Sequence, residues 1–344
     1  MSLLARYAEH LFWLSRYAER AASLARIIET HAACNPSMQE KTSWAWLVKL
    51  HADDDNFAKE HLEASARNVL NFYIRDLNNI GSILFAVHAS RENARALRAI
   101  LPTEMWSQLN GFYNKLRSIR ESDIDPIRLS RTCSAIKMGC RDQFGIAESM
   151  LYRDEGWRFY QLGRFSERGS QTSRVLDVRF AQLVTNEGRD QDSKDARLWQ
   201  PILRSAAAYQ AYIRLGQGSM DAEHIARFLI LNQSHPGSIA FCCSCIEHQL
   251  HKLRIGFNLT PASPLRERLA ELASYLRAVN RCQDLVSEVH DISCGLQRHF
   301  DDITRALAAS YFNIVPDSQK QFADGNPAAA RCYTETPSRA NCHT

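Results

Sequence analysis

Apolar residues recur at helical spacing along almost the whole chain. In the N-terminal segment they return every third or fourth position, from Leu4 through Leu11 and Leu14 to Ile28. This is the spacing of a helix that is packed along its entire length. No alternating segment longer than a few residues indicates a strand. The pattern therefore predicts an all-α fold.

Proline, glycine and Asn/Asp clusters divide this pattern into successive helices. The first should run from about Ser2 to Ala33, because proline disfavours helical geometry in the residue before it and Pro36 follows soon after. Short connections between long helices favour antiparallel neighbours, so we predict a mostly antiparallel long-helix bundle. The other main helices are expected at about 44–51, 57–74, 79–100, 102–120, 125–150, 154–183, 199–215, 264–279 and 284–309.

One stretch of the chain occurs twice. Residues 14–20 read LSRYAER and residues 162–168 read LGRFSER, 148 positions later, and at the same offset Arg26 aligns with Arg174 without a gap. The repeat predicts a helical domain, 1–312, built from two related halves at about 1–153 and 154–312, each with a Glu-Arg helix. Residues 313–344 lose the periodicity and are expected to form a flexible tail.

The charges of the repeat share one helix face. Arg16, Glu19 and Arg20 stand at i, i+3 and i+4. An exposed ladder of ion pairs would stabilise the helix by only about 0.3 to 0.5 kcal/mol per pair, and it would not require Phe12 and Trp13 beside the charges. Small residues at matching positions of both copies would let the helices approach closely. We therefore expect a shared, partly buried ionic centre that is either structural or ligand-binding, formed by Arg16, Glu19, Arg20, Arg164, Glu167 and Arg168.

A second group of charges lies in the middle of the first half. Arg91, Arg95 and Arg98 form a stripe at i, i+4 and i+7, with Glu92 and Asn93 beside it. Such a stripe could bind a carboxylate or phosphate through charge-assisted hydrogen bonds. A solvated helix face explains the same pattern equally well. If the stripe meets the Glu-Arg helices, we expect an arginine-rich centre that suits an anionic ligand.

Several of these stretches together resemble a known family. The run from Leu4 to Ile28 resembles the opening signature of the bacterial alpha-E family, all-helical domains of unknown activity that are named for a Glu-Arg motif. Residues 89–95 are similar to its central segment, and residues 156–168 to its second Glu-Arg helix. Ser15 stands where the family has Gly, and Ser90 where it usually has Ala. The resemblance covers nearly the whole chain and leaves the charged positions intact.

The resemblance also implies a setting for the protein. Alpha-E proteins are commonly encoded with, or fused to, ATP-grasp amide ligases and transglutaminase-like peptidases. It therefore implies an accessory or scaffold protein in the synthesis or modification of a peptide or amide-linked compound. The sequence carries no recognisable cofactor motif, so no cofactor is expected. The competing interpretation is an enzyme of the same system, with Glu19 or Glu167 as the base and the arginines holding an anionic substrate.

Composition excludes several other classes of function. The net charge is only +4, and basic and acidic residues are mixed, which argues against nucleic-acid binding. No run approaches the roughly 18 apolar residues of a spanning helix, and Arg6 and Glu9 interrupt the first apolar stretch, unlike a signal peptide. We expect a cytoplasmic protein without membrane contact, and an oligomer is possible. The ten cysteines are irregularly spaced and are interpreted as reduced, mostly buried thiols.

The familiar enzymatic motifs are absent from the sequence. It has no glycine-rich phosphate loop, no His-Glu-x-x-His, no Gly-x-Ser-x-Gly and no Glu-x-x-His pair. Cys243, Glu247 and His251 lie along one helix face at i, i+4 and i+8, but the first and third positions are about 12 Å apart. An ordinary amphipathic helix is favoured over a metal site there. Cys332, Cys342 and His343 lack the paired spacing of a designed site.

Overall fold

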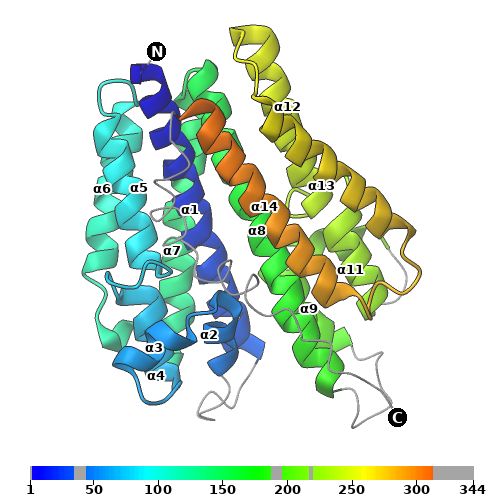
Figure 1. Cartoon of the computed structure of the whole chain (residues 1–344). Coiled ribbons are helices and arrows are strands. Elements are labelled where there is room, and N and C mark those ends of the chain that lie inside the picture. Colours follow the sequence, from blue (N-terminus) through cyan, green and yellow to red (C-terminus); the bar gives the residue numbers. More distant parts are fainter. Residues whose placement is uncertain (1, 35–43, 187–195, 217–219, 313–344) are drawn as a thin grey trace.

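The chain folds into a bundle of α-helices. The structure is a computed structural model that describes residues 2–34, 44–186, 196–216 and 220–312 (Figure 1). Within these ranges every regular element is helical. The predicted all-α, long-helix class is therefore confirmed. The tail predicted at 313–344, with Cys332, Cys342 and His343, lies outside the described residues.

Two long helices form the centre of the bundle, α1 (Ser2–Cys34) and α8 (Glu155–Asn186). They lie side by side and run in the same direction (Figure 1). The Ser15 hydroxyl donates to the carbonyl of Tyr160 at 2.6 Å, and further along the pair Arg168 donates to Glu19. The sequence predicts mostly antiparallel neighbours, whereas the helices of this central pair are parallel. Helices so far apart in the sequence have no short connection between them that would force opposite directions.

The backbones of α1 and α8 approach closely where the two copies of the repeat differ. A Cβ atom placed on Gly163 would lie 2.1 Å from the carbonyl oxygen of Phe12. At the matching position of the other copy, Ser15 fills the space and uses its hydroxyl to bond α8. Glycine at 163 therefore permits the contact between the two helices.

Each central helix is covered by its own antiparallel partners. On α1 lie α5 (Ile83–Ala96) and α7 (Pro126–Met150), and on α8 lie α12 (Ile239–Phe257) and α14 (Val289–Tyr311) (Figure 1). The outer helices α6 (Thr103–Arg117) and α13 (Ser263–Arg281) pack against these. The central pair is consequently enclosed from both sides, and the charged side chains of the repeat are buried or half-buried.

Two of the predicted helices are broken in the structure. The helix expected at 57–74 is replaced by separate short elements, because His61 is extended and the side chain of Ser65 caps a new helix by accepting from the backbone of Asn68 at 3.3 Å. The helix expected at 199–215 is interrupted at Ala207, which has a positive φ of 55°.

The shorter elements are α2 (Ala45–His51), α3 (Asp54–Glu60), α4 (Ala66–Leu70), the π-helix η1 (Asn71–Arg75), the 3-10 helix η2 (Glu121–Asp123), α9 (Ala196–Ser205), α10 (Tyr209–Arg214) and α11 (Ala222–Leu231).

Helices α5 and α12 begin in the same way. The hydroxyl of Ser82 accepts a hydrogen bond from the backbone N–H of Phe85 at 3.0 Å, and Ser238 accepts one from Phe241 at 3.3 Å. The tripeptide Gly-Ser-Ile spans the start of each helix, at 81–83 and 237–239, with the serine as N-cap and the isoleucine as the first helical residue. The match supports the division into two related halves, which stays a prediction.

Burial in the central pair includes both apolar and ionic residues. Phe12 and Leu14 of α1 and Leu162 of α8 have no exposed surface, and Arg16 and Glu167 are buried among them. Of the helices that the structure describes, none combines the length and the apolar character needed to cross a membrane.

Candidate functional site

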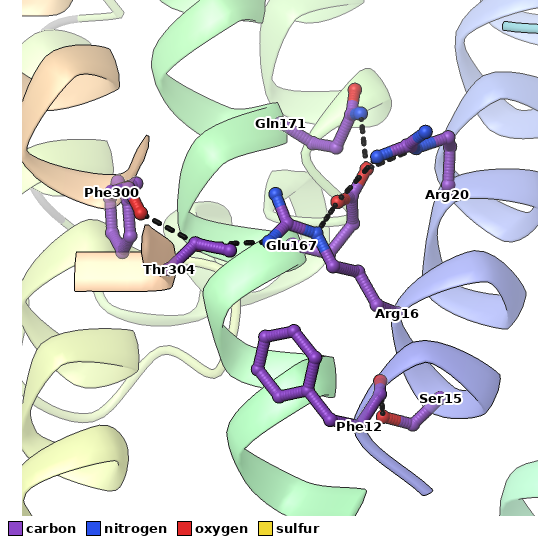
Figure 2. Close-up of polar contacts among 8 residues, drawn as sticks. All are labelled: Phe12, Ser15, Arg16, Arg20, Glu167, Gln171, Phe300 and Thr304. Carbon is purple, nitrogen blue, oxygen red and sulfur yellow. Dashed lines mark hydrogen bonds and ion pairs between the residues drawn. The ribbon is translucent and has the colours of Figure 1, made fainter. Parts of the chain in front are cut away.

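Glu167 of α8 is held between two arginines of α1, as Figure 2 shows. Arg16 donates from Nε to Oε2 at 2.7 Å, and Arg20 donates from Nε to Oε1 at 2.7 Å and from Nη2 to Oε2 at 3.1 Å. Gln171, one turn along α8, adds a fourth hydrogen bond to Oε1 at 2.9 Å. Both carboxylate oxygens are thus fully engaged, and the charge is balanced by direct contacts.

A third helix joins this cluster through Arg16. Its Nη1 donates to the hydroxyl of Thr304 on α14 at 2.8 Å, and that hydroxyl donates to the carbonyl of Phe300 at 2.8 Å (Figure 2). Arg16 therefore connects α1, α8 and α14 through one guanidinium group. Its planar group with several fixed donors suits such a position.

Glu19 of α1 occupies the reciprocal arrangement with arginines of α8. Arg168 binds it in a bidentate manner, with Nε and Nη2 each at 2.8 Å from a carboxylate oxygen. Arg164 forms an ion pair at 3.5 Å, and its guanidinium lies over the ring of Phe144 at 4.3 Å from the centroid. The structure therefore brings all six charged residues of the repeat to one contact between α1 and α8.

The two carboxyl groups are strongly acidic in this environment. Burial alone would raise the pKa of Glu167, but the positive charges of Arg20 and Arg16 outweigh it and lower the pKa well below its ordinary value. Burial would likewise raise the pKa of Glu19, but Arg168, Arg164 and Arg26 together outweigh it and lower the pKa. Both groups stay ionised through the physiological range. A carboxylate of such low proton affinity is a poor general base.

One protein family has a profile that covers these residues and nearly the whole chain. The profile of the alpha-E family, described as a predicted α-helical domain with a conserved ER motif, matches residues 3–312. The match includes both Glu-Arg helices and nearly all of the described bundle. The chain belongs to the alpha-E family.

Relatives of this alpha-E chain occur in mycobacteria. Uncharacterised proteins of Mycobacterium bovis and Mycobacterium tuberculosis are each 21% identical to it over 339 residues, which cover 90% of the chain. The chain spans only 36% of the length of either relative, so the alpha-E segment is one part of a longer polypeptide there. No solved structure matches the chain.

Two further arginines of the alpha-E chain lie at the centre, although the sequence analysis did not place them there. Arg174 is buried, its Nε has no hydrogen-bond partner, and its pKa is lowered because burial outweighs the attraction of Glu167 and Asp301. Arg26 is half-buried, reaches the carbonyl of Ser205 at 3.5 Å, and also has a lowered pKa because of its burial. The sequence signal that could have placed them there was the alignment of Arg26 with Arg174 in the repeat.

A buried histidine and a buried aspartate lie near the Glu167 side and were likewise not expected. The pKa of His51 is lowered to about 3 by burial and by the charges of Arg174 and Arg20, so its ring is neutral. Asp53 accepts from the hydroxyl of Tyr73 at 2.9 Å, and burial raises its pKa to about 6. Both come from the α2–α3 region, where no repeat or motif marks them.

The arginine stripe of α5 has its own partners outside the Glu-Arg contact. Arg91 donates from Nε to Asn110 of α6 at 2.8 Å, from Nη1 to Glu92 at 2.6 Å, and lies over the ring of Trp106. Arg95 is exposed and pairs with the other oxygen of Glu92 at 2.6 Å. The contacts found for these side chains join α5 to α6, and none of them involves the six residues of the Glu-Arg centre.

Asn93 lies between α5 and the central helix. Its amide oxygen is 2.8 Å from Nδ1 of His10 on α1. On the other side of the bundle, the amide oxygen of Gln249 on α12 accepts from Arg158 of α8 at 3.2 Å. The two contacts occupy corresponding places, so Asn93 has a bridging role between helices.

The three residues aligned on α12 are not brought together as a metal site. Cys243 is buried, and burial raises the pKa of its thiol well above the ordinary value, whereas Glu247 and His251 are exposed. Cys243 and Glu247 line a cavity of about 410 Å³ beside α11 and α13, and His251 is not part of its wall. Within the described residues, the three do not form a group able to share one ion. The thiols of Cys133, Cys140, Cys242 and Cys243 are buried and are not in disulfides.

Proposed function

We propose that this alpha-E chain is an accessory or scaffold protein of a system that forms or modifies peptide or amide bonds. It would work with an ATP-grasp amide ligase and a transglutaminase-like peptidase. The observation that carries the non-catalytic role is the complete engagement of Glu167, which accepts four hydrogen bonds and is 1% exposed.

The reciprocal pairing gives the centre a mechanical role. A general base needs a pKa near the working pH, and the pKa of both carboxylates is lowered. Instead, the glutamate of each helix pairs with arginines of the other helix, and these two sets of ion pairs fix the position of α1 against α8. A rigid bundle of this kind suits a protein that holds other subunits in place.

The length of the relatives supports a role beside other domains. Because the chain corresponds to 36% of each mycobacterial protein, an alpha-E segment functions there within a larger polypeptide. The association with ATP-grasp and transglutaminase-like proteins comes from the family resemblance. Together they favour a module that acts next to enzymes over a free-standing enzyme.

A second candidate function is the binding of an anionic substrate or ligand. It is favoured by Arg174, a buried guanidinium whose Nε lacks a hydrogen-bond partner, since an unsatisfied buried donor on a charged group is costly. Under this alternative, the protein would be an enzyme of the same system. Sulfate or phosphate should then raise the melting temperature of the wild type, and Arg174→Gln should abolish that effect.

The partnership is tested by co-expression. The genes next to this one should include an ATP-grasp ligase and a transglutaminase-like protein, and these should co-purify with the tagged chain. Amide formation by the ligase should increase when the alpha-E chain is added. A gene without such neighbours, or a ligase that neither binds the chain nor responds to it, contradicts the proposal.

The same reconstituted system separates scaffold from enzyme. For a scaffold, Glu19→Gln lowers the melting temperature, and turnover falls only as the folded fraction falls. For an enzyme, the same change abolishes turnover while the melting temperature is retained. Glu271→Gln is the matched control, because Glu271 pairs with Arg268 at 2.7 Å on the exposed surface.

A further inference from the structure

A cavity of about 410 Å³ is lined by residues of α11, α12 and α13, none of which belongs to the Glu-Arg centre. Its volume is in the range of sites for small molecules. Ala240 and Cys243 of α12 are buried in its wall, and Leu276 of α13 is half-buried beside them. Glu247 of α12 and Arg277 of α13 also line it and are exposed. The cavity therefore has an apolar floor and a charged rim.

The helices around this cavity match α5 and α6 of the first half. The shared Gly-Ser-Ile starts align α5 with α12 at a spacing of 156 residues. Apolar positions align α6 with α13 at a spacing of 167 residues, Met105 with Leu272, Leu109 with Leu276 and Phe112 with Val279.

Contacts of α6 and α13 support this alignment. Gln108 of α6 donates to the carbonyl of Gly139 on α7 at 2.7 Å. Its match on α13, Tyr275, lies against α14, where a Cβ atom placed on Gly295 would be 2.3 Å from the tyrosine hydroxyl. Gly295 stands 156 residues after Gly139, which is the spacing of the Gly-Ser-Ile starts. The two outer helices therefore have matching neighbours.

In the first half, side chains fill the place that corresponds to the cavity. Arg91 lies over the rings of Trp106 and Tyr113, 5.4 and 5.2 Å from their centroids. It also donates to Asn110 at 2.8 Å. In the second half, smaller side chains stand at the two aromatic positions and line the cavity, Ala273 for Trp106 and Asn280 for Tyr113. The space is open because these rings are absent.

The same alignment changes the charges around the space. Glu247 stands in the place of Arg91, and Arg277 in the place of its acceptor Asn110. Arg277 donates to Ser274 of its own helix at 2.8 Å. Among the residues that the structure describes, neither Glu247 nor Arg277 is in an ion pair. A carboxylate on α12 and a guanidinium on α13 can therefore each take a partner of opposite charge.

We propose that this cavity binds a small zwitterion with an apolar body, of the class of an apolar amino acid or a short apolar peptide. Its ammonium group pairs with Glu247, and its carboxylate pairs with Arg277, whose planar group suits a carboxylate. The apolar body lies on Ala240 and Leu276. Burial raises the pKa of the Cys243 thiol, so this part of the floor is uncharged. The two rim charges select against compounds that carry charge of one sign only.

Calorimetric titration of the full-length chain with leucine and with leucyl-leucine tests this binding. At least one of the two compounds should bind, and their Kd values show whether an amino acid or a peptide is preferred. N-acetylation or C-amidation of the bound compound should weaken binding about fivefold to tenfold, because each removes one ion pair.

Variants of the chain assign each contact. Glu247→Gln should weaken binding of the free compound and leave the Kd of its N-acetyl form unchanged, and Arg277→Gln should act in the same way on the amide form. Ala273→Trp places a ring where the first half has Trp106 and should abolish binding. The matched control is Ala278→Trp, at an exposed position of the same helix outside the cavity, which should keep it. Circular dichroism establishes that each variant is folded.

The proposal is overturned if neither compound binds, if the blocked forms bind as tightly as the free compound, or if Ala273→Trp binds as well as Ala278→Trp. The titration uses the isolated chain, whereas the proposed partnership is tested by co-purification with a ligase. Failure of one is therefore distinguishable from failure of the other.

Discussion

The two glutamates of the Glu-Arg centre have the same kinds of partners in different surroundings. Around Glu167, the side chains of Arg16 and Arg20 are 5% and 9% exposed. Around Glu19, those of Arg164 and Arg168 are 22% and 18% exposed. One sequence motif has thus produced an interior ion-pair cluster and a second one nearer the surface.

The difference arises from what packs over each cluster. Helix α14 covers the Glu167 side and supplies Thr304, and the buried Arg174 adds a further cation there. On the Glu19 side, Arg164 rests on the ring of Phe144 and keeps part of its surface in water. An arginine that loses its carboxylate partner can be hydrated more readily on the Glu19 side than on the Glu167 side. The same substitution should therefore have unequal consequences.

The largest effect is expected for Glu167→Gln. The change removes the negative charge between two arginines that have little access to water, and a broken buried ion pair typically costs about 3 to 5 kcal/mol. Urea unfolding followed by circular dichroism measures this loss in the free energy of unfolding. The exposed control Glu271→Gln should change it by less than about 1 kcal/mol. A loss below that value for Glu167→Gln would mean that the cluster does not stabilise the fold.

Glu19→Gln should cost less, about 1.5 to 3 kcal/mol, the range for hydrogen bonds to charged groups. Arg164 and Arg168 can take up water after the change because both retain exposed surface. The measurement is again the free energy of unfolding in urea, made beside Glu167→Gln. An equal or larger loss for Glu19→Gln would show that the exposure of the arginines does not govern the cost.

A pH dependence distinguishes the two sides further, because His51 lies on the Glu167 side, where Arg174, Arg20 and Glu167 act on its ring. Its pKa is about 3 in the folded chain and near 6.5 ordinarily, so the unfolded chain binds more protons between these values. The stability contributed by the neutral ring is full above pH 6.5 and is lost as the pH falls toward 3. Between pH 6 and 4 the wild type should lose up to about 1.4 kcal/mol per pH unit more than His51→Gln.

The comparison of the wild type with His51→Gln is necessary because Asp53 titrates over the same pH interval. Its pKa is raised to about 6, so over the same interval its protonation favours the folded state and acts in the opposite direction. Asp53 is present in both proteins, and the difference between their unfolding free energies reports His51. Parallel curves for the two proteins would contradict a buried neutral ring.

The smallest effect is expected for Thr304→Val, which keeps the shape of the side chain and removes the acceptor of Arg16 Nη1. The lost hydrogen bond to a buried guanidinium should cost about 1.5 kcal/mol, the lower end of the range for hydrogen bonds to charged groups. Adding the change to Glu167→Gln should cost less than it does alone, because both residues hold the same arginine. Additivity in this double-mutant cycle would show that Thr304 acts independently of the cluster.

The sequence predicted the fold class and the meeting of the two Glu-Arg helices for the same reason. Helical spacing defines faces, and the repetition of Arg16, Glu19 and Arg20 beside aromatic residues marked one face as buried. The parallel direction of α1 and α8 was not accessible, because no short loop joins them. The reciprocal exchange of partners depends on that direction and was missed with it.

Other parts of the site carried weaker signals. The serine caps of α5 and α12 match at a spacing of 156 residues, so an alignment without gaps at 148 does not pair them. His51 and Asp53 lie in short elements whose position depends on tertiary packing.

The exchange of partners between α1 and α8 also constrains the order of folding during synthesis. Helix α1 emerges from the ribosome first, but Arg16 and Arg20 receive their counter-charge only when Glu167 has been made. At ~5 to 20 residues per second, the 148 positions that separate the copies require roughly 7 to 30 s. During this interval the charged face of the nascent helix is uncovered. The final packing of the N-terminal half is therefore a late event in folding.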